Sequence, residues 1–460
     1  MKRCTILFAV ALLAVFCSQV IGAESDKLAE ENAQLRGRVD KLEQELAVIK
    51  EMLMQQAAAT KQAQKPVKVE ELTEGDIAKL SELLREKGDK KLVKSSLEID
   101  LYGYIKADAS YDNSRTTPGN YVKWVDSENT GNNDNEFNMT ANQTRIGMNI
   151  KGLEDDGLLT SGRVEVDFYG NGTAENKSGI LVRHVYMKLD WPEDNFSIIA
   201  GQTSDVISPL TPYTLNYSVA WWAGNIGYRR PQIRLTKGFS LSDKTDLKLE
   251  GAIARTIGRS SDLGDDDTTT NSESGEDAGY PSLQGRVSLT TPLLTKLPAT
   301  VGVSGHYGRE EYDITSSGGK NKKFESWSLN VDLHQPINDW LAFKSEGFVG
   351  ENLNQYLGGI GQGVNMTTLS EIRTQGGWVA ASITPQGKWK YNLGISMEDV
   401  KNGDLNAGDR SQNRSIFGNA IYSINKNTSV GFELSQWQTK RVGESDADDI
   451  RAQTSFIYKF

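Results

Sequence analysis

Six basic residues have the chemistry and the positions needed to bind an anion. They are Lys106, Arg145, Arg163, Arg229, Arg230 and Arg234. An arginine guanidinium can bind a carboxylate through two parallel hydrogen bonds, and it keeps its charge at every physiological pH. Arginines that line one aqueous path would therefore favour anionic solutes. Alternatively, these cations could pair with nearby acids such as Asp108, Glu165 and Asp167, and the sequence leaves that possibility open.

Recognisable catalytic motifs are absent from the sequence. It contains no Gly-x-Ser-x-Gly elbow and no His-Glu-x-x-His motif. The stretch Gly318-Gly319-Lys320 lacks the upstream glycine and the following Ser or Thr of a phosphate-binding loop. The three histidines, His184, His306 and His334, do not have metal-ligand spacing. We therefore expect no enzyme activity, no cofactor and no metal site.

Residues 1–23 have the pattern of a cleaved signal peptide. Lys2 and Arg3 precede an apolar run over residues 6–15, and the small residues Gly22 and Ala23 follow. The alternative, a membrane anchor, would need about 20 apolar residues. This leader contains both cysteines, two of the 51 Lys and Arg residues and none of the 61 Asp and Glu residues. The remaining chain would thus be free of cysteine with a net charge of −12, which argues against a nucleic-acid partner.

Residues 24–56 show the repeat of a coiled coil. Apolar positions recur at alternating spacings of four and three, with charged residues between them. The seam residues are Leu28, Asn32, Leu35, Val39, Leu42, Leu46, Ile49 and Leu53. The alternative is a single amphipathic helix packed on a core, but the apolar stripe is too narrow for that. The seam predicts an oligomer but does not decide the number of its subunits. Residues 57–96 are predicted to form a linker with one short helix.

From residue 97 to residue 460 the periodicity changes from helical to two. In residues 97–112, for example, Ile105 and Ala107 alternate with Lys106 and Asp108. Such strands suit a transmembrane barrel, with one face in contact with lipid and one facing a wet lumen. About 16 segments of this kind, joined alternately by short turns and long polar loops, predict an all-β barrel of antiparallel strands. A soluble extracellular β-protein is the alternative.

The last strand ends on an aromatic residue. Phe456, Tyr458 and Phe460 share one face of this strand. This ending resembles the assembly signal of outer-membrane porins. We therefore expect the barrel assembly machinery, outer-membrane lipid and lipopolysaccharide among the partners.

Residues 202–230 form an unusual connection after the fifth predicted strand. Its candidate constriction residues are Pro209, Tyr213, Trp221 and Trp222. The segment is too apolar to extend into solvent, and its place in the strand order matches the loop that folds into trimeric porins. The alternative is a loop packed on the rim or at a contact between subunits.

Three segments, together with the heptad seam, carry a resemblance to a known family. They read LYGYIKADASYD at residues 101–112, TRIGMNIKG at residues 144–152 and GQTSDVISPLTPYTLNY at residues 201–217. The chain resembles the DcaP-like trimeric porins of Gram-negative bacteria, most strongly in the first half of the barrel. The resemblance implies a 16-stranded homotrimer, a periplasmic coiled coil, and uptake of small organic anions such as dicarboxylates. It also implies that the constriction segment and its arginines line the solute path.

The sequence thus predicts an outer-membrane channel for small hydrophilic solutes, with an anion-selective lumen. The nearest alternative is a general porin without solute preference, which would differ only in whether anions bind inside. An alternative of another class is a structural protein that anchors the cell wall through the coiled coil and has a sealed barrel. That alternative predicts no conductance.

Overall fold

The computed structural model describes residues 98–130, 134–170, 177–258, 274–314 and 320–460. The predicted signal peptide (1–23), coiled coil (24–56) and linker (57–96) lie outside the described residues, so they stay predictions. Among the helices of the described part of the chain, none is long and apolar enough to cross a membrane.

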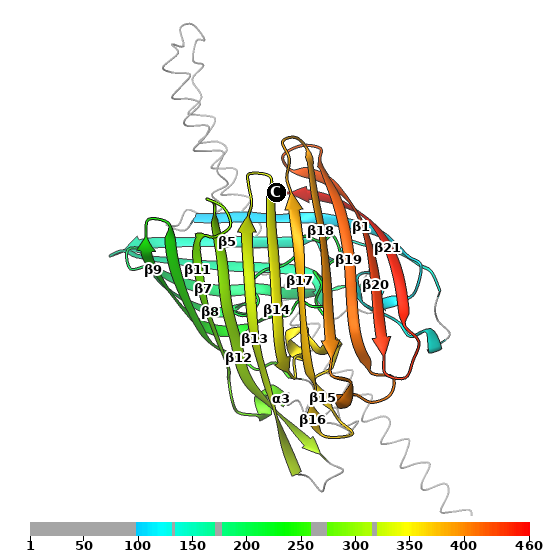
Figure 1. Ribbon diagram of the computed structural model, residues 1–460. Coiled ribbons are helices and arrows are strands. Elements are labelled where there is room, and N and C mark those ends of the chain that lie inside the picture. The colour runs from blue at the N-terminus through cyan, green and yellow to red at the C-terminus, as the bar shows by residue number, and fades with distance from the viewer. Residues whose placement is uncertain (1–97, 131–133, 171–176, 259–273, 315–319) are drawn as a thin grey trace, which may run out of the picture. The chain divides into compact units, whose positions relative to one another are not determined.

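The described chain forms one closed antiparallel β-barrel (Figure 1). Segments β4 and β5 both pair with β1 and make one interrupted strand, so the wall has 16 strands. The wall consists of β1 (Glu98–Asp112), β4 (Glu136–Thr140), β5 (Arg145–Asp155), β6 (Leu158–Gly170), β7 (Gly179–Trp191), β8 (Phe196–Ser204), β9 (Arg229–Ser242), β10 (Thr245–Ala254), β11 (Ser282–Pro292), β12 (Pro298–Ile314), β13 (Lys320–Pro336), β14 (Leu341–Glu351), β17 (Arg373–Ile383), β18 (Trp389–Val400), β19 (Arg410–Ser423), β20 (Thr428–Arg441) and β21 (Ala447–Lys459). Pairing of β1 with β21 closes the ring. The predicted barrel is confirmed.

Alternation along each strand sorts apolar side chains outward and polar side chains inward. On β1, Leu101 and Ile105 are 50% and 53% exposed, whereas Lys106 and Asp108 are 3% and 6% exposed. Successive side chains of a strand point to opposite faces, so one strand supplies both surfaces. The outward face is an apolar band, as expected for a wall in contact with lipid.

Short turns join the strands at one rim, and loops join them at the other (Figure 1). Three loops matter for the lumen, and we call them L1 (residues 113–135), L3 (residues 205–228) and L6 (residues 352–372). L1 contains the hairpin β2 (Thr116–Pro118) and β3 (Val122–Val125) and the short helix η1 (Glu128–Thr130). L6 contains η4 (Asn354–Tyr356), η5 (Gly359–Gly361), β15 (Val364–Asn365) and β16 (Ser370–Glu371).

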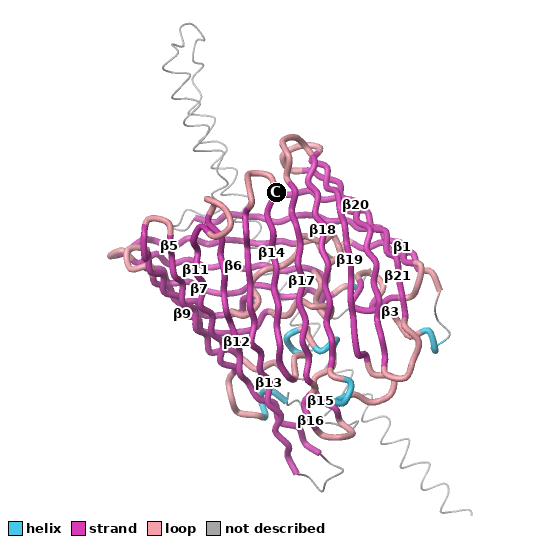
Figure 2. Tube along the Cα trace, viewed as in Figure 1, coloured by secondary structure: helices cyan, strands magenta, loops and turns pink. Residues whose placement is uncertain are grey.

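The remaining helices are also short and lie in loops (Figure 2). They are α3 (Ser274–Asp277) and η6 (Asn402–Asp404). Many of the buried apolar side chains belong to loops, because the wall turns its own apolar side chains outward. Ile207 and Ile226 of L3, for example, pack with Leu353 and Tyr356 of L6 and with Phe348 of β14. The loops therefore form the packed interior of the barrel.

Candidate solute path and constriction

Loop L3 folds into the barrel and reaches the opposite wall. The Leu210 amide donates a hydrogen bond to Glu346 on β14 over 2.7 Å. Farther along, the amides of Leu215 and Asn216 donate to Glu433 on β20 over 2.6 and 3.1 Å. Buried backbone amides need partners, and inward carboxylates of the wall supply them. The structure thus places the predicted constriction segment across the lumen.

The far end of L3 has a strained backbone. Val219, Ala220 and Trp222 have φ values of 45°, 63° and 63°, in the left-handed region that side chains disfavour. Such conformations persist only where the surroundings fix them. Here the Trp222 amide donates to the Leu357 carbonyl of L6 over 2.8 Å, and the Ala223 amide donates to the Ala220 carbonyl over 3.0 Å. The shape of L3 therefore depends on L6.

Lys106 is buried against L3 rather than open to the lumen. Its ammonium donates to the Leu215 carbonyl over 2.7 Å and lies 3.2 Å from the Asp108 carboxylate. It also contacts the Gln143 side-chain oxygen. These contacts fix L3 to β1. Because protein groups already surround its ammonium, Lys106 has little capacity left to bind a solute.

Arg230 is likewise enclosed, with no exposed surface. Its Nε lies 2.7 Å from Oδ1 of Asp205, and its guanidinium stacks 3.8 Å from the ring centre of Tyr356. Its Nη2 donates to the Gln355 carbonyl over 3.2 Å. Asp205 begins L3, while Gln355 and Tyr356 belong to L6. Arg230 therefore joins the two loops instead of lining the path.

Three predicted arginines lie on the inner face of the wall, on β5, β6 and β9. Arg145 on β5 lies 3.4 Å from Glu165, and its side chain is 23% exposed. Arg163 on β6 donates to Asn149 over 2.9 Å, and Arg234 on β9 donates to Gln232 over 3.0 Å. Among the residues that the structure describes, neither Arg163 nor Arg234 forms an ion pair with a carboxylate. We call Arg145, Arg163 and Arg234 the arginine sector.

Arg229 is 5% exposed and sits among aromatic rings. Its guanidinium lies 4.7 Å from the ring centre of Tyr228 and 5.7 Å from that of Trp221. Its Nε and Nη2 have no hydrogen-bond partner within the described structure. The rings stabilise part of its charge through cation–π attraction, and among the described residues it forms no ion pair with an acid.

Arg183 on β7 also points into the barrel, and the sequence pattern did not predict it. It lies 2.8 Å from both Glu165 and Asp167, so it pairs with the acids expected to neutralise the predicted arginines. The register of β6 with β7 shifts between Glu165 and Val166. At this irregularity, inward and outward side chains do not alternate strictly. A sequence pattern of period two therefore does not predict that Arg183 points inward.

The predicted aromatic and proline residues of L3 divide into two groups. Pro209, with Leu210, borders a cavity of about 620 Å³ near the short-turn rim, whose wall includes Lys248, Arg286 and His334. Tyr213 is 53% exposed, and Lys344 on β14 lies 4.0 Å from its ring centre. Trp221 and Trp222 are instead buried beside Tyr217. Pro209 and Tyr213 therefore face open space, while the two tryptophans support the loop.

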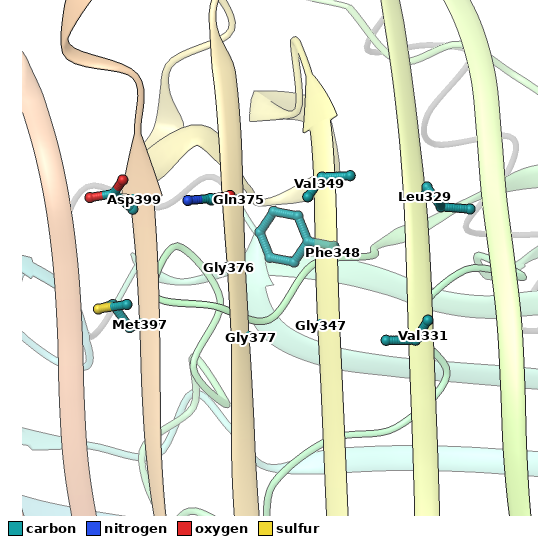
Figure 3. A pocket seen from close by; sticks show the side chains of 10 residues that line it. All are labelled: Leu329, Val331, Gly347, Phe348, Val349, Gln375, Gly376, Gly377, Met397 and Asp399. Atoms are coloured by element: carbon teal, nitrogen blue, oxygen red, sulfur yellow. The ribbon is translucent and has the colours of Figure 1, made fainter.

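A second hollow lies on the outer face of the barrel and is not part of the solute path (Figure 3). It measures about 600 Å³. Exposed apolar side chains border it, namely Leu329, Val331, Val349 and Met397. Gly347 and Gly377 pair across β14 and β17 and leave a depression between these side chains. This surface belongs to the lipid-facing band.

Comparison with known proteins identifies relatives of this chain. Residues 20–255 match the model of a family described as DcaP outer membrane protein. The outer membrane channel DcaP of Acinetobacter baumannii has a similar structure, with a TM-score of 0.62 and 18% identity over 80% of this chain and 99% of that chain. The anion-selective porin from Comamonas acidovorans matches with a TM-score of 0.52 and 13% identity over 79% of this chain and all of that chain. No curated protein matches this chain by sequence.

Proposed function

Because this chain belongs to the DcaP outer membrane protein family and is therefore a porin of the outer membrane, we propose that it admits small organic anions such as dicarboxylates. Family and barrel fold indicate a channel rather than an enzyme. The proposal concerns which solutes the channel prefers.

The observation that carries the proposal is the charge of the arginine sector. Arg145, Arg163 and Arg234 lie on the inner wall, and two of them have no acid partner among the described residues. Guanidinium groups left unneutralised on a wet wall attract anions and can bind a carboxylate transiently. A dicarboxylate carries two such groups, so it would interact with more than one arginine during passage.

Other cations of the lumen favour the alternative of a general porin. Lys188 lies 2.8 Å from Asp190, and Lys248 lies 3.2 Å from Glu250. These pairs add little net field to the path. The selectivity therefore depends on the arginine sector, where the excess of positive charge lies.

We also propose a homotrimer whose residues 24–56 form a coiled coil in the periplasm. The described chain enters the barrel at Glu98 of β1, and the Lys151–Glu98 ion pair lies at the rim with the short turns. In outer-membrane barrels the short turns are periplasmic. The mass of the purified complex, with and without residues 24–56, would test this assembly.

The solute proposal is tested by neutralising the sector. The double variant Arg163→Gln/Arg234→Gln should reduce the anion-to-cation permeability ratio and weaken block by succinate in a planar bilayer. Arg255→Gln is the matched control, because Arg255 already pairs with Glu276 over 2.7 Å outside the wall. Equal selectivity in the double variant, the control and the parent protein would contradict the proposal.

A further inference from the structure

We propose that the loop-side mouth of the barrel holds a second anion-binding site, formed by Lys123, Arg410 and Arg441 around Trp124, which captures dianions before they reach the arginine sector. This inference rests on the proposed function and adds an entry site to it. Its ligands would be compact dianions with carboxylate or phosphate groups.

The three cations come from distant parts of the sequence. Lys123 lies on β3 within L1, Arg410 begins β19 and Arg441 ends β20. Arg410 and Arg441 are directly opposite each other in the pairing of β19 with β20. Like charges at opposite positions of two strands are unfavourable. A bound anion between them would turn this repulsion into attraction.

Within the described residues, neither arginine forms an ion pair with an acid. Arg410 donates through Nε to the Ile360 carbonyl over 2.9 Å, and Arg441 donates through Nη2 to the Val125 carbonyl over 2.7 Å. Carbonyl oxygens orient a guanidinium but carry no full charge. Nη1 of Arg441 is buried without a hydrogen-bond partner in the described structure. Both side chains are therefore held in place, and each guanidinium still has N–H groups that can donate to a ligand.

Three acids lie near the cluster, and each has a further partner. Asp126 lies 3.5 Å from Arg115, Asp409 accepts a hydrogen bond from the Asn406 amide over 2.7 Å, and Glu444 accepts one from Ser127. Over the described ranges, no ion pair forms between these acids and Lys123, Arg410 or Arg441. These acids act on the two arginines through space, but among the described contacts none of them accepts a hydrogen bond from either guanidinium.

Aromatic rings position the cations. The Arg410 guanidinium lies 4.1 Å from the ring centre of Trp124. The Lys123 ammonium lies 4.9 Å from the ring centre of Trp222 and 5.8 Å from that of Trp124. Trp222 belongs to L3, so the site adjoins the constriction loop. An anion released from this site would be next to the segment that narrows the lumen.

Space for a ligand lies beside Arg410, whereas Lys123 and Arg441 are not among the residues that line it. A cavity of about 350 Å³ is lined by Arg410, Gln362, Asn365 and Asn406, with Asp409 as its one acidic neighbour among the lining residues. Asn406 has an amide hydrogen left for a carboxylate or phosphate, whereas Gln362 and Asn365 already use both of theirs within the protein. Burial and the neighbouring Arg410 also lower the pKa of Lys123, as expected where positive charges gather without a counter-ion.

The test is single-channel block with the anion added to one side only. In Arg410→Gln/Arg441→Gln, the on-rate for succinate or inorganic phosphate added on the loop side should fall about tenfold, because electrostatic capture is lost. The on-rate from the short-turn side should stay unchanged. Arg373→Gln is the matched control, since Arg373 stands at the same rim but pairs with Asp404 over 2.6 Å.

Two further variants guard against a folding defect. Arg410→Lys/Arg441→Lys should restore most of the on-rate, and Lys123→Gln should lower it without removing either arginine. A loop-side on-rate for both anions within twofold of the parent value in Arg410→Gln/Arg441→Gln would overturn the entry site. Failure of the proposed function would look different, because the parent protein would then show no anion preference from either side.

Discussion

The Arg230 guanidinium lies 3.8 Å from the ring centre of Tyr356, and this contact joins the constriction loop to L6. Around it, the Gly227 amide donates to the Tyr356 carbonyl over 2.8 Å, and the Tyr356 hydroxyl lies 2.6 Å from the Ser282 hydroxyl. L3 is thus fixed on its loop side by a second loop. We therefore expect the width of the lumen beside L3 to depend on both loops.

Removing this ring should loosen the constriction. Tyr356→Ala deletes a buried aromatic side chain, a change that typically costs about 3–5 kcal/mol. Since the loss falls on L3 and L6 rather than on the wall, we expect a larger and noisier single-channel conductance from an intact barrel. Tyr356→Phe keeps the ring and loses only the contact with Ser282. If both variants conduct like the parent protein, L6 does not set the width.

Lys106 should matter for stability more than for permeation. Lys106→Met leaves the Asp108 carboxylate buried without its cation, a change that typically costs about 3–5 kcal/mol. We expect a lower temperature of barrel unfolding, read from the heat-dependent shift in gel mobility. Lys151→Met is the control, because its partner Glu98 and Lys151 itself are both exposed. Equal unfolding temperatures for the two variants would contradict the role given to Lys106.

Capture at the mouth should depend on pH through Lys123. Because burial and Arg410 lower the pKa of this lysine, it loses its positive charge at a lower pH than an ordinary lysine does. The loop-side on-rate of succinate block should therefore fall as the pH rises from neutral to about 10. Tyr121 lies beside Lys123, and burial raises its pKa, so it stays neutral over the lower part of this range. Burial lowers the pKa of Arg410 and of Arg441 as well, so the lower part of this pH range is the part that reports on Lys123.

Lys123→Arg provides the control for this pH dependence. An arginine at the same position stays protonated throughout, so the on-rate should become nearly constant with pH. A parent protein whose loop-side on-rate does not change with pH would argue against Lys123 as part of the site.

The wall could be predicted from the sequence because its signal is local. Leu101 and Lys106 face opposite ways as a result of strand geometry alone, and this alternation recurs along the wall except where the register shifts, as between β6 and β7. The inward path of L3 followed from a similar local signal. A connection that contains Pro209, Trp221 and Trp222 has too much apolar surface to remain in water.

Side-chain partners could not be predicted in the same way. Arg230 looked like a pore residue until the path of L3 placed Asp205 beside it. Val125 and Arg441 are far apart in the sequence, and the Arg441 guanidinium reaches the Val125 carbonyl because closure of the barrel brings L1 beside β20. Contacts of this kind depend on tertiary structure, which a pattern of period two does not contain.

Single-channel recording of the parent protein in a planar bilayer under a salt gradient tests the central claim most directly, with succinate then added to one side. We predict a reversal potential whose sign indicates anion selectivity. Channels should open in groups of three equal conductance steps, and succinate should block them briefly. A current that prefers cations and is not blocked would contradict the anion assignment and leave a general porin. Absence of any current would contradict the open channel itself and favour a sealed barrel.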